Sequence, residues 1–301
     1  MKNGIYVGPN APAELVDAVR AGGGIICPAL DAQAFIWYGA SATEFGDVVH
    51  PGVRWVQLQA AGVESWLAAG VIRGNRQFTS AAGCYATAVA EHTLAVLLAA
   101  ARRLHELARA QTWTKPAPVS LNGSTVTIVG AGGIGGALIA LLAPFDVQVL
   151  AVTRSGRQVV GADESLAPAS LHDALRRADY VVLAAPDTGQ TRSMIGADEL
   201  ALMKSTAWLV NIARGSLVDT GALVAALQSG TIGGAALDVT DPEPLPDGHP
   251  LWSAPEALIT PHSANTDALL LPELAKRVKD NTERFIAGRP LTGLIDPVRG
   301  Y

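Results

Sequence analysis

Cysteine is scarce in this chain. Cys27 and Cys84 are the only cysteines among 301 residues, and neither belongs to a CxxC pair. A disulfide framework is therefore excluded, and a reducing compartment is the simplest inference. A single thiol beside a glycine and a tyrosine could act as a nucleophile, but Cys84 is better interpreted as a small apolar residue. No spacing of histidine and cysteine residues indicates a metal site.

Charged residues are also few. They make up 16% of the chain, which fits extensive buried surface and an oligomer, although enrichment in alanine and glycine explains the value equally well. The 22 basic and 27 acidic residues give a net charge of −5, with no basic block or stripe. Binding to nucleic acid therefore has little electrostatic support.

Long hydrophobic runs are missing as well. The N-terminal segment, residues 1–15, lacks the apolar core and the cleavage-like site of a signal peptide. The most helix-like apolar stretch, residues 88–103, is interrupted by Glu91 and His92 and is too short to span a bilayer. We therefore expect a soluble, cytoplasmic protein that does not bind membranes.

What the chain does contain is an alternation of short apolar runs with helical patterns. Strands of four to six residues separated by helices are typical of parallel sheets built from βαβ units, so we expect an α/β protein. The expected strands are residues 4–8, 34–38, 54–59, 125–130, 147–152, 180–185, 207–212, 234–239 and 257–260. The expected helices are residues 11–20, 86–108, 133–143, 169–177, 197–203, 219–229 and 266–287.

A glycine-rich turn follows the strand at 125–130. Gly130, Gly132 and Gly135 form a GxGxxG pattern between this strand and the helix at 133–143. The first glycine permits a tight turn, the second lets backbone approach a pyrophosphate, and the third allows close packing of helix on strand. Alone the motif could be structural, but the strand before it, the helix after it and the next strand favour a dinucleotide site.

The residues after the next strand bear on the choice of nucleotide. NAD sites place an acidic residue there to bind the ribose hydroxyls. This chain has Thr153 at that position, followed by Arg154 and Arg157. A hydroxyl and two guanidinium groups would accept a 2′-phosphate, so we predict a preference for NADP over NAD. The alternative is that both arginines are solvated surface residues.

Three further strand ends carry an arginine, a carboxylate and a histidine. Arg214 could bind a carboxylate with its planar fork and stabilise charge on a carbonyl oxygen. His262 could donate a proton, because imidazole titrates near neutral pH. Glu243 could hold the far ring nitrogen of His262 and favour its charged form. Each residue alone could be structural, but together they form the set needed to reduce an α-keto acid.

These motifs resemble those of the D-isomer-specific 2-hydroxyacid dehydrogenases over essentially the whole chain. The resemblance is carried by VGAGGIGG, ADYVVLAAPDTGQT (178–191), LVNIARGSLVD (209–219), GGAALDVTDPEPLP (233–246), HPLW (249–252) and TPHSAN (260–265). It implies an NAD(P)-dependent oxidoreductase in which Arg214, Glu243 and His262 are catalytic.

The resemblance also implies binding residues. Asp238 falls on the acid that contacts the nicotinamide amide, and Ala61, Gly62 and Val63 fall on a loop whose N–H groups, with Arg214, bind the substrate carboxylate. The implied cofactor contacts are Gly130, Gly132, Gly133, Ile134, Gly135, Thr153, Arg154, Arg157, Ala185, Pro186, Ala213 and Asp238.

The family's architecture implies two Rossmann-like domains with parallel sheets and a cleft that closes on substrate. We expect a dinucleotide-binding domain at 93–267, inserted into a discontinuous, flavodoxin-like substrate domain made of 1–92 and 268–301. The polar stretch 111–124 precedes the glycine turn. A homodimer held by the nucleotide domains, with the helix at 88–103 in its interface, is also implied.

Within the family, the Thr-Arg pair, IWYG (36–39) and IDPVRGY (295–301) look most like the glyoxylate/hydroxypyruvate reductase branch. The chain departs from the family pattern at Thr240 and Asn265, which are expected to border the substrate pocket, so specificity does not carry over directly. The alternatives are a dehydrogenase of the same fold for phosphoglycerate, formate or phosphite, and a non-catalytic protein that senses nucleotides.

Overall fold

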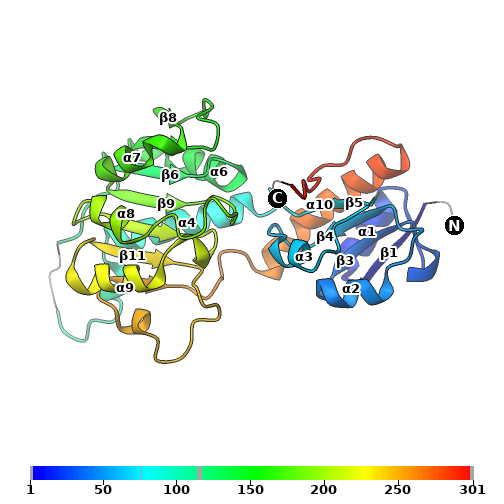
Figure 1. The fold of residues 1–301 in the computed structure, drawn as a ribbon, viewed down its shortest axis with the longest axis horizontal. Helices are drawn as coiled ribbons and strands as arrows, with labels where there is room; N and C mark the ends of the chain where they lie inside the picture. Colours follow the sequence, from blue (N-terminus) through cyan, green and yellow to red (C-terminus); the bar gives the residue numbers. More distant parts are fainter. Residues whose placement is uncertain (1–2, 75, 114–116, 299–301) are drawn as a thin grey trace. The chain divides into compact units, whose positions relative to one another are not determined.

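The computed structural model describes residues 3–74, 76–113 and 117–298. The polar stretch 111–124 and the terminal IDPVRGY motif therefore lie partly outside the described residues. The chain divides into two compact units, which are coloured by sequence in Figure 1. Unit 1 comprises Met1–Tyr85 and Asn265–Tyr301, and unit 2 comprises Ala86–Ala264.

Unit 1 is built on a five-stranded parallel sheet with the order β2-β1-β3-β4-β5. This is the flavodoxin-like strand order. Its strands are β1 (Gly4–Pro9), β2 (Ile25–Ile26), β3 (Ala34–Tyr38), β4 (Trp55–Leu58) and β5 (Gln77–Thr79). Its helices are α1 (Ala13–Ala21), α2 (Ala42–Val48), α3 (Glu64–Ala68) and α10 (Asp267–Ile286).

Both faces of this sheet are covered, and for that reason β3 is buried at every position. Ile36 packs in a core with Leu15 of α1 and Leu274 of α10. Its neighbour Trp37 points the other way, into a core that includes Phe45 of α2. Alternate side chains of one strand thus supply two cores.

Unit 2 has a seven-stranded parallel sheet with the order β8-β7-β6-β9-β10-β11-β12. Counted within the unit this is 3-2-1-4-5-6-7, the doubly wound order of dinucleotide-binding folds with one added strand. Its strands are β6 (Thr125–Val129), β7 (Gln148–Val152), β8 (Glu164–Leu166), β9 (Tyr180–Leu183), β10 (Trp208–Asn211), β11 (Gly234–Leu237) and β12 (Ala257–Ile259).

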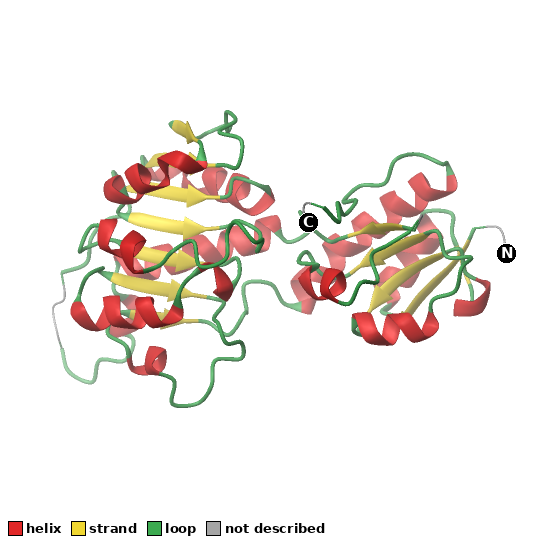
Figure 2. Cartoon of the chain, viewed as in Figure 1, coloured by secondary structure: helices red, strands yellow, loops and turns green. Residues whose placement is uncertain are grey.

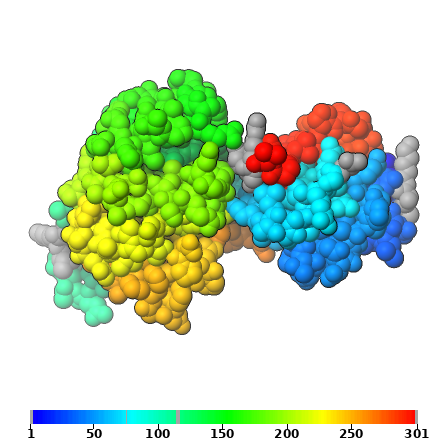
Figure 3. Space-filling model, in the orientation of Figure 1, coloured from blue at the N-terminus to red at the C-terminus, as the bar shows by residue number. Residues whose placement is uncertain are grey.

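Helices cover both faces of the second sheet too (Figure 2). Those on one face are α4 (Ala86–Ala101) and α6 (Gly133–Leu142), which pack against each other. The other face carries α7 (Leu171–Arg177), α8 (Ala197–Leu202) and α9 (Thr220–Ser229). In the space-filling view these last segments, coloured green to yellow, lie on the face of unit 2 that is turned to the viewer (Figure 3).

All nine strands expected from the sequence are present, with ends displaced by at most two residues. The sequence missed β2, β5 and β8, which are edge strands of two or three residues, and the helices α2 and α3. The expected helix at 86–108 is wrong as a single element. It ends at Ala101, and the short α5 (Leu104–Leu107) follows Arg103, whose φ of 52° is left-handed.

Within the described part of the chain, no helix is both long enough and apolar enough to cross a membrane.

Candidate active site

The strands of unit 2 end on a common row, which brings the predicted residues to one edge of the sheet. Val152, Val129, Leu183, Asn211, Leu237 and Ile259 are paired neighbours across the sheet. The glycine turn, Thr153, Arg214, Asp238, Glu243 and His262 all follow this row within a few residues. Parallel α/β sheets bind ligands at this carboxyl edge.

The glycines of the turn after β6 serve different purposes. Gly130 has a φ of 100°, and a Cβ there would lie 2.6 Å from the backbone nitrogen of Ala185, at the end of β9. A Cβ on Gly135 would overlap the carbonyl oxygen of Gly130. At both positions, backbone atoms of the protein already fill the space that a side chain would need. At Gly132, by contrast, a Cβ would meet nothing within 4 Å.

The turn opens directly into α6, whose first N–H groups have no side-chain cap. Gly132 is the N-cap residue, Gly133 is exposed, and Ile134 is half-buried. Uncapped N–H groups at the start of a helix, together with the helix dipole, form an anion-binding site. The open approach at Gly132 leaves space for a pyrophosphate, so this cradle fits a dinucleotide.

The end of β7 carries no carboxylate. Thr153 is 8% exposed, and its buried hydroxyl oxygen has no hydrogen-bond partner among the described residues. Arg154 and Arg157 are exposed, and Arg157 Nη2 donates a hydrogen bond of 3.2 Å to the carbonyl oxygen of Ala131. A guanidinium group therefore lies directly against the glycine turn, and an unsatisfied hydroxyl stands where a ribose is expected.

Arg214 lies in a turn that is stabilised by hydrogen bonds from the side chain of Asn211. Asn211, 1% exposed at the end of β10, donates to the carbonyl oxygen of Arg214 at 2.8 Å and accepts from the N–H of Ala213 at 3.1 Å. Arg214 Nη1 also donates to the carbonyl oxygen of Ala213, at 2.7 Å. The sequence prediction missed Asn211, although an amide at the end of the apolar run in LVNI was a usable signal.

The backbone next to Arg214 lies against the segment that carries Glu243. A Cβ on Gly215 would overlap the carbonyl group of Thr240, and Thr220 Oγ1 donates to the carbonyl oxygen of Asp241 at 2.6 Å. The turn after β10 and the segment after β11 are therefore in backbone contact. Only glycine permits so close an approach.

The loop that follows β9 is tied to the same turn. Asp187, which follows Ala185 and Pro186, accepts hydrogen bonds from Ser216 Oγ at 2.8 Å and from Arg192 at 3.0 Å. Ala185 is buried and Pro186 is exposed. No role for Asp187 was expected from the sequence, yet its contact with Ser216 links two of the expected cofactor-contacting segments.

Glu243 and His262 are directly hydrogen-bonded. Glu243 Oε1 lies 2.6 Å from His262 Nδ1, and the two side chains are 41% and 51% exposed. With Nδ1 engaged in this way, Nε2 is the ring nitrogen that could exchange a proton with a bound molecule. The hydrogen bond expected from the sequence is therefore confirmed.

His262 has an unusual backbone conformation. Its φ is 48°, in the left-handed region, which costs about 1–3 kcal/mol for a residue other than glycine. Its N–H donates to the carbonyl oxygens of Asp238 at 2.8 Å and of Thr260 at 3.0 Å. Residues held in this way are common at functional sites.

Asp238 compensates this strain from beneath the loop. Asp238 is buried, and its carboxylate accepts hydrogen bonds from Thr260 Oγ1 at 2.6 Å, from Ser263 N at 2.9 Å and from Ala264 N at 3.1 Å. Hydrogen bonds to a charged group contribute about 1.5–3 kcal/mol each. The loop around His262 is therefore fixed by an aspartate for which the sequence predicted a contact with cofactor.

Ala61, Gly62 and Val63 belong to unit 1, where they link β4 to α3. Val63 is buried and precedes the first residue of α3. Gln59 fixes the start of the segment with two hydrogen bonds. Its side-chain oxygen accepts one from Gly39 N at 2.8 Å, and its backbone carbonyl oxygen accepts one from the hydroxyl of Tyr85. Burial raises the pKa of the Tyr85 hydroxyl, which therefore remains a neutral donor.

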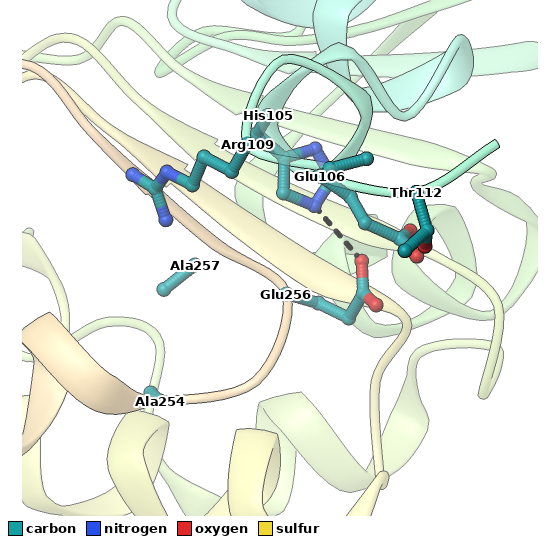
Figure 4. Close-up of a pocket in the computed structure, with 8 residues that line it drawn as sticks. His105, Glu106, Arg109, Thr112, Ala254, Glu256 and Ala257 are labelled. Atoms are coloured by element: carbon teal, nitrogen blue, oxygen red, sulfur yellow. Dashed lines mark hydrogen bonds and ion pairs between the residues drawn. The ribbon is translucent and has the colours of Figure 1, made fainter. Parts of the chain in front are cut away.

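A cavity of about 450 Å³ lies at the opposite edge of the second sheet (Figure 4). His105, Glu106, Arg109 and Glu256 are among its lining residues. Glu256, which precedes β12, binds His105 Nε2 at 3.0 Å and Arg103 at 2.7 Å. This is the amino end of the strands, whereas parallel sheets bind ligands at the carboxyl end, so the cavity is not the expected place for the cofactor.

Within residues 3–74, 76–113 and 117–298, no group of three or more histidine, cysteine, aspartate or glutamate residues could hold a metal ion.

Comparison with known proteins agrees with this site. Residues 94–264 match the sequence model of the D-isomer specific 2-hydroxyacid dehydrogenase NAD-binding domain. A glyoxylate reductase from Aeropyrum pernix is 34% identical over 258 residues, covering 82% of this chain and 77% of that protein. The chain belongs to the D-isomer-specific 2-hydroxyacid dehydrogenase family.

Solved structures agree over the full length. A D-isomer specific 2-hydroxyacid dehydrogenase from Xanthobacter autotrophicus Py2, in complex with NADPH and MES, is 26% identical with a TM-score of 0.86 and covers 100% of both chains. An NADPH-dependent glyoxylate/hydroxypyruvate reductase from Sinorhizobium meliloti, in complex with NADP and sulfate, is 25% identical with a TM-score of 0.84 and also covers 100% of both chains. The protein is thus an oxidoreductase that uses a nicotinamide dinucleotide.

Proposed function

We propose that this enzyme reduces a small 2-keto acid such as glyoxylate or hydroxypyruvate to the D-2-hydroxy acid, with NADPH preferred over NADH. The observation that carries the proposal is the Glu243–His262 hydrogen bond, at the same sheet edge as the glycine turn and Arg214. The names of the relatives from Aeropyrum pernix and Sinorhizobium meliloti support this substrate class.

The proposed chemistry divides among three side chains. A reduced nicotinamide cofactor, when bound, would supply the hydride that the keto carbon accepts. Arg214 pairs with the substrate carboxylate and stabilises negative charge as it develops on the carbonyl oxygen. His262 donates the proton on Nε2 to that oxygen, which becomes the hydroxyl group. Glu243 holds Nδ1 and stabilises the imidazolium before the proton is transferred.

For the cofactor, we propose that the N–H groups at the start of α6 bind the pyrophosphate. Thr153, Arg154 and Arg157 would bind the ribose and its 2′-phosphate, which the NADPH-bound relatives support. Asp238 would contact the nicotinamide amide while it holds the loop around His262. The remaining proposed contacts are Gly130, Gly132, Gly133, Ile134, Gly135, Ala185, Pro186 and Ala213.

We propose unit 2 as the dinucleotide-binding domain and unit 1 as the substrate domain. In unit 1, the N–H groups of Ala61, Gly62 and Val63 are the proposed contacts for the substrate carboxylate. We also propose that the enzyme is a homodimer, as the resemblance to the family implies.

The direct test measures how fast the wild-type enzyme and His262→Asn oxidise NADPH and NADH. Each assay contains one 2-keto acid from a series of increasing size. We expect turnover of glyoxylate or hydroxypyruvate, and a decrease in kcat of about 10²–10⁴-fold in the variant. NADPH should still bind to the variant, and the change in NADPH fluorescence on binding measures this. A variant with near wild-type kcat would exclude His262 as the proton donor.

The same assay separates the alternatives. Activity confined to phosphoglycerate, formate or phosphite would replace the proposed substrate but keep the family. Tight NADPH binding without turnover of any acid would instead favour a protein that senses nucleotides.

A further inference from the structure

His92 lies on α4, outside the loops that carry the proposed catalytic residues, yet it contacts the residues beneath His262. Its Nε2 is 3.1 Å from Thr260 Oγ1 and 3.5 Å from Asp238 Oδ1. The His92 side chain is 20% exposed, and that of Asp238 is 2% exposed. Thr260 is 168 residues away from His92 in sequence, so the sequence alone gave no reason to connect them.

The chemistry of the three groups fixes the direction of their hydrogen bonds. The Asp238 carboxylate can only accept, so the single proton of the Thr260 hydroxyl must point to Oδ1, 2.6 Å away. The Thr260 oxygen must then accept its second hydrogen bond from His92. His92 therefore carries a proton on Nε2, and a directed chain runs from His92 to Thr260 to Asp238.

This chain ends on the group that holds His262 in its strained conformation. Asp238 binds the loop on both sides of His262, through Thr260 before it and through Ser263 and Ala264 after it. The His262 N–H binds backbone oxygens of the same two residues, Asp238 and Thr260. The orientation of the His262 ring thus depends on Thr260, whose hydroxyl is held between His92 and Asp238.

We propose that His92 is a positioning residue for His262, acting through Thr260 and Asp238. This inference rests on the proposed function, because it assumes that His262 is the proton donor. α4 packs against α6 and against β10 and β11, so it offers a fixed support. His92 on this helix aligns the proton donor without touching substrate.

The test compares His92→Leu with His92→Gln, because glutamine can place an N–H donor where Nε2 stands and leucine cannot. We expect His92→Leu to lower kcat by about tenfold or more, since a displacement of about 1 Å can cost 10²-fold. The KM for keto acid should change less than threefold, because Arg214 has its own supports. His92→Gln should recover most of the lost kcat.

Two further variants follow the chain of hydrogen bonds. Thr260→Val removes the hydroxyl and keeps the shape, so it should lower kcat as His92→Leu does, whereas Thr260→Ser should remain close to wild type. The double variant His92→Leu/Thr260→Val should be no slower than the worse single variant, because both break the same chain. The solvent isotope effect on kcat should rise in His92→Leu, as proton transfer becomes slower.

The outcomes separate this inference from the proposed function. If His262→Asn is inactive but His92→Leu has wild-type kcat, the positioning role is wrong and the proposed function stands. If His92→Leu and His92→Gln show the same decrease in kcat, the same increase in KM and the same loss of thermal stability, His92 is structural and the inference is overturned. If His262→Asn is active, the proposed function itself fails. His172→Leu, at an exposed histidine paired with Glu199, controls for the loss of an imidazole.

Discussion

Glu243 Oε1 and His262 Nδ1 lie 2.6 Å apart, although the two residues come from loops after different strands and both side chains are about half exposed. Because the pair is half exposed, its geometry depends on hydrogen bonds from neighbouring residues more than on burial. Thr240 N lies 3.4 Å from the second oxygen of Glu243, and Asp238 fixes the loop of His262.

We expect Glu243→Gln to lower kcat for keto-acid reduction by about 10²-fold, because an amide neither fixes the tautomer as firmly nor stabilises an imidazolium. The dissociation constant for NADPH should remain within a factor of about three. Steady-state kinetics and fluorescence titration measure the two quantities. Glu273→Gln is a matched control, because Glu273 forms an exposed ion pair with Lys276. A kcat for Glu243→Gln equal to that of the control would refute the role of Glu243.

The arginine that lies against the glycine turn provides a test of cofactor preference. Arg157→Ala should lower kcat/KM for NADPH by about tenfold, the value of one charge-assisted hydrogen bond, and leave kcat/KM for NADH nearly unchanged. Arg157→Lys keeps the charge, so its kcat/KM for NADPH should lie between those of the wild type and Arg157→Ala. Equal losses with both cofactors would show that Arg157 supports the turn through Ala131 and does not read the 2′-phosphate.

Gly215 should not tolerate a side chain. A Cβ there overlaps the Thr240 carbonyl group, which belongs to backbone and cannot rotate away. We expect Gly215→Ala to lower the free energy of unfolding by about 1–3 kcal/mol and to reduce kcat as well, because the turn of Arg214 and the segment of Glu243 must separate.

Gly46→Ala is the contrasting change. Gly46 lies within α2, and a Cβ there meets nothing within 4 Å. Alanine should raise the free energy of unfolding by about 0.5–1 kcal/mol without affecting kcat. Urea denaturation of both variants measures the difference. Equal stability of the two variants would show that the contact at Gly215 relaxes.

Cys84 should be an unreactive thiol. Burial raises its pKa, so the thiolate that attacks electrophiles is scarce at neutral pH. We expect reaction with a disulfide reagent to be at least about tenfold slower in the folded protein than in urea, and to accelerate as the pH rises. Cys84→Ser should retain wild-type kcat, and loss of activity in this variant would revive the interpretation of Cys84 as a nucleophile.

The strand ends could be predicted from sequence because buried parallel strands are continuous apolar runs. Where such a run stops, the next polar residue lies at the sheet edge, and this rule located Arg214 and His262. Asp238 was expected only from the resemblance to the family, which did not show what its carboxylate binds within the protein. Its partners depend on the path of the loop through Ser263 and Ala264.

Features that depend on distant partners were out of reach. The helical pattern continues past Ala101 without glycine or proline, yet the helix stops there. Arg103 takes a left-handed conformation and binds Glu256, which is 153 residues away in sequence. The same reason applies to His92, because its partner Thr260 is 168 residues away in sequence.

Unit 1 is assembled from both ends of the chain, and this has a consequence during synthesis. Leu274 and Val278 of α10 complete the core that contains Ile5 and Leu15, but a ribosome makes them only after the whole of unit 2. At about 5–20 residues per second this delay is roughly ten to forty seconds. During that time only α1 covers this face of the sheet, so part of the apolar core of unit 1 stays open until the end of the chain is made.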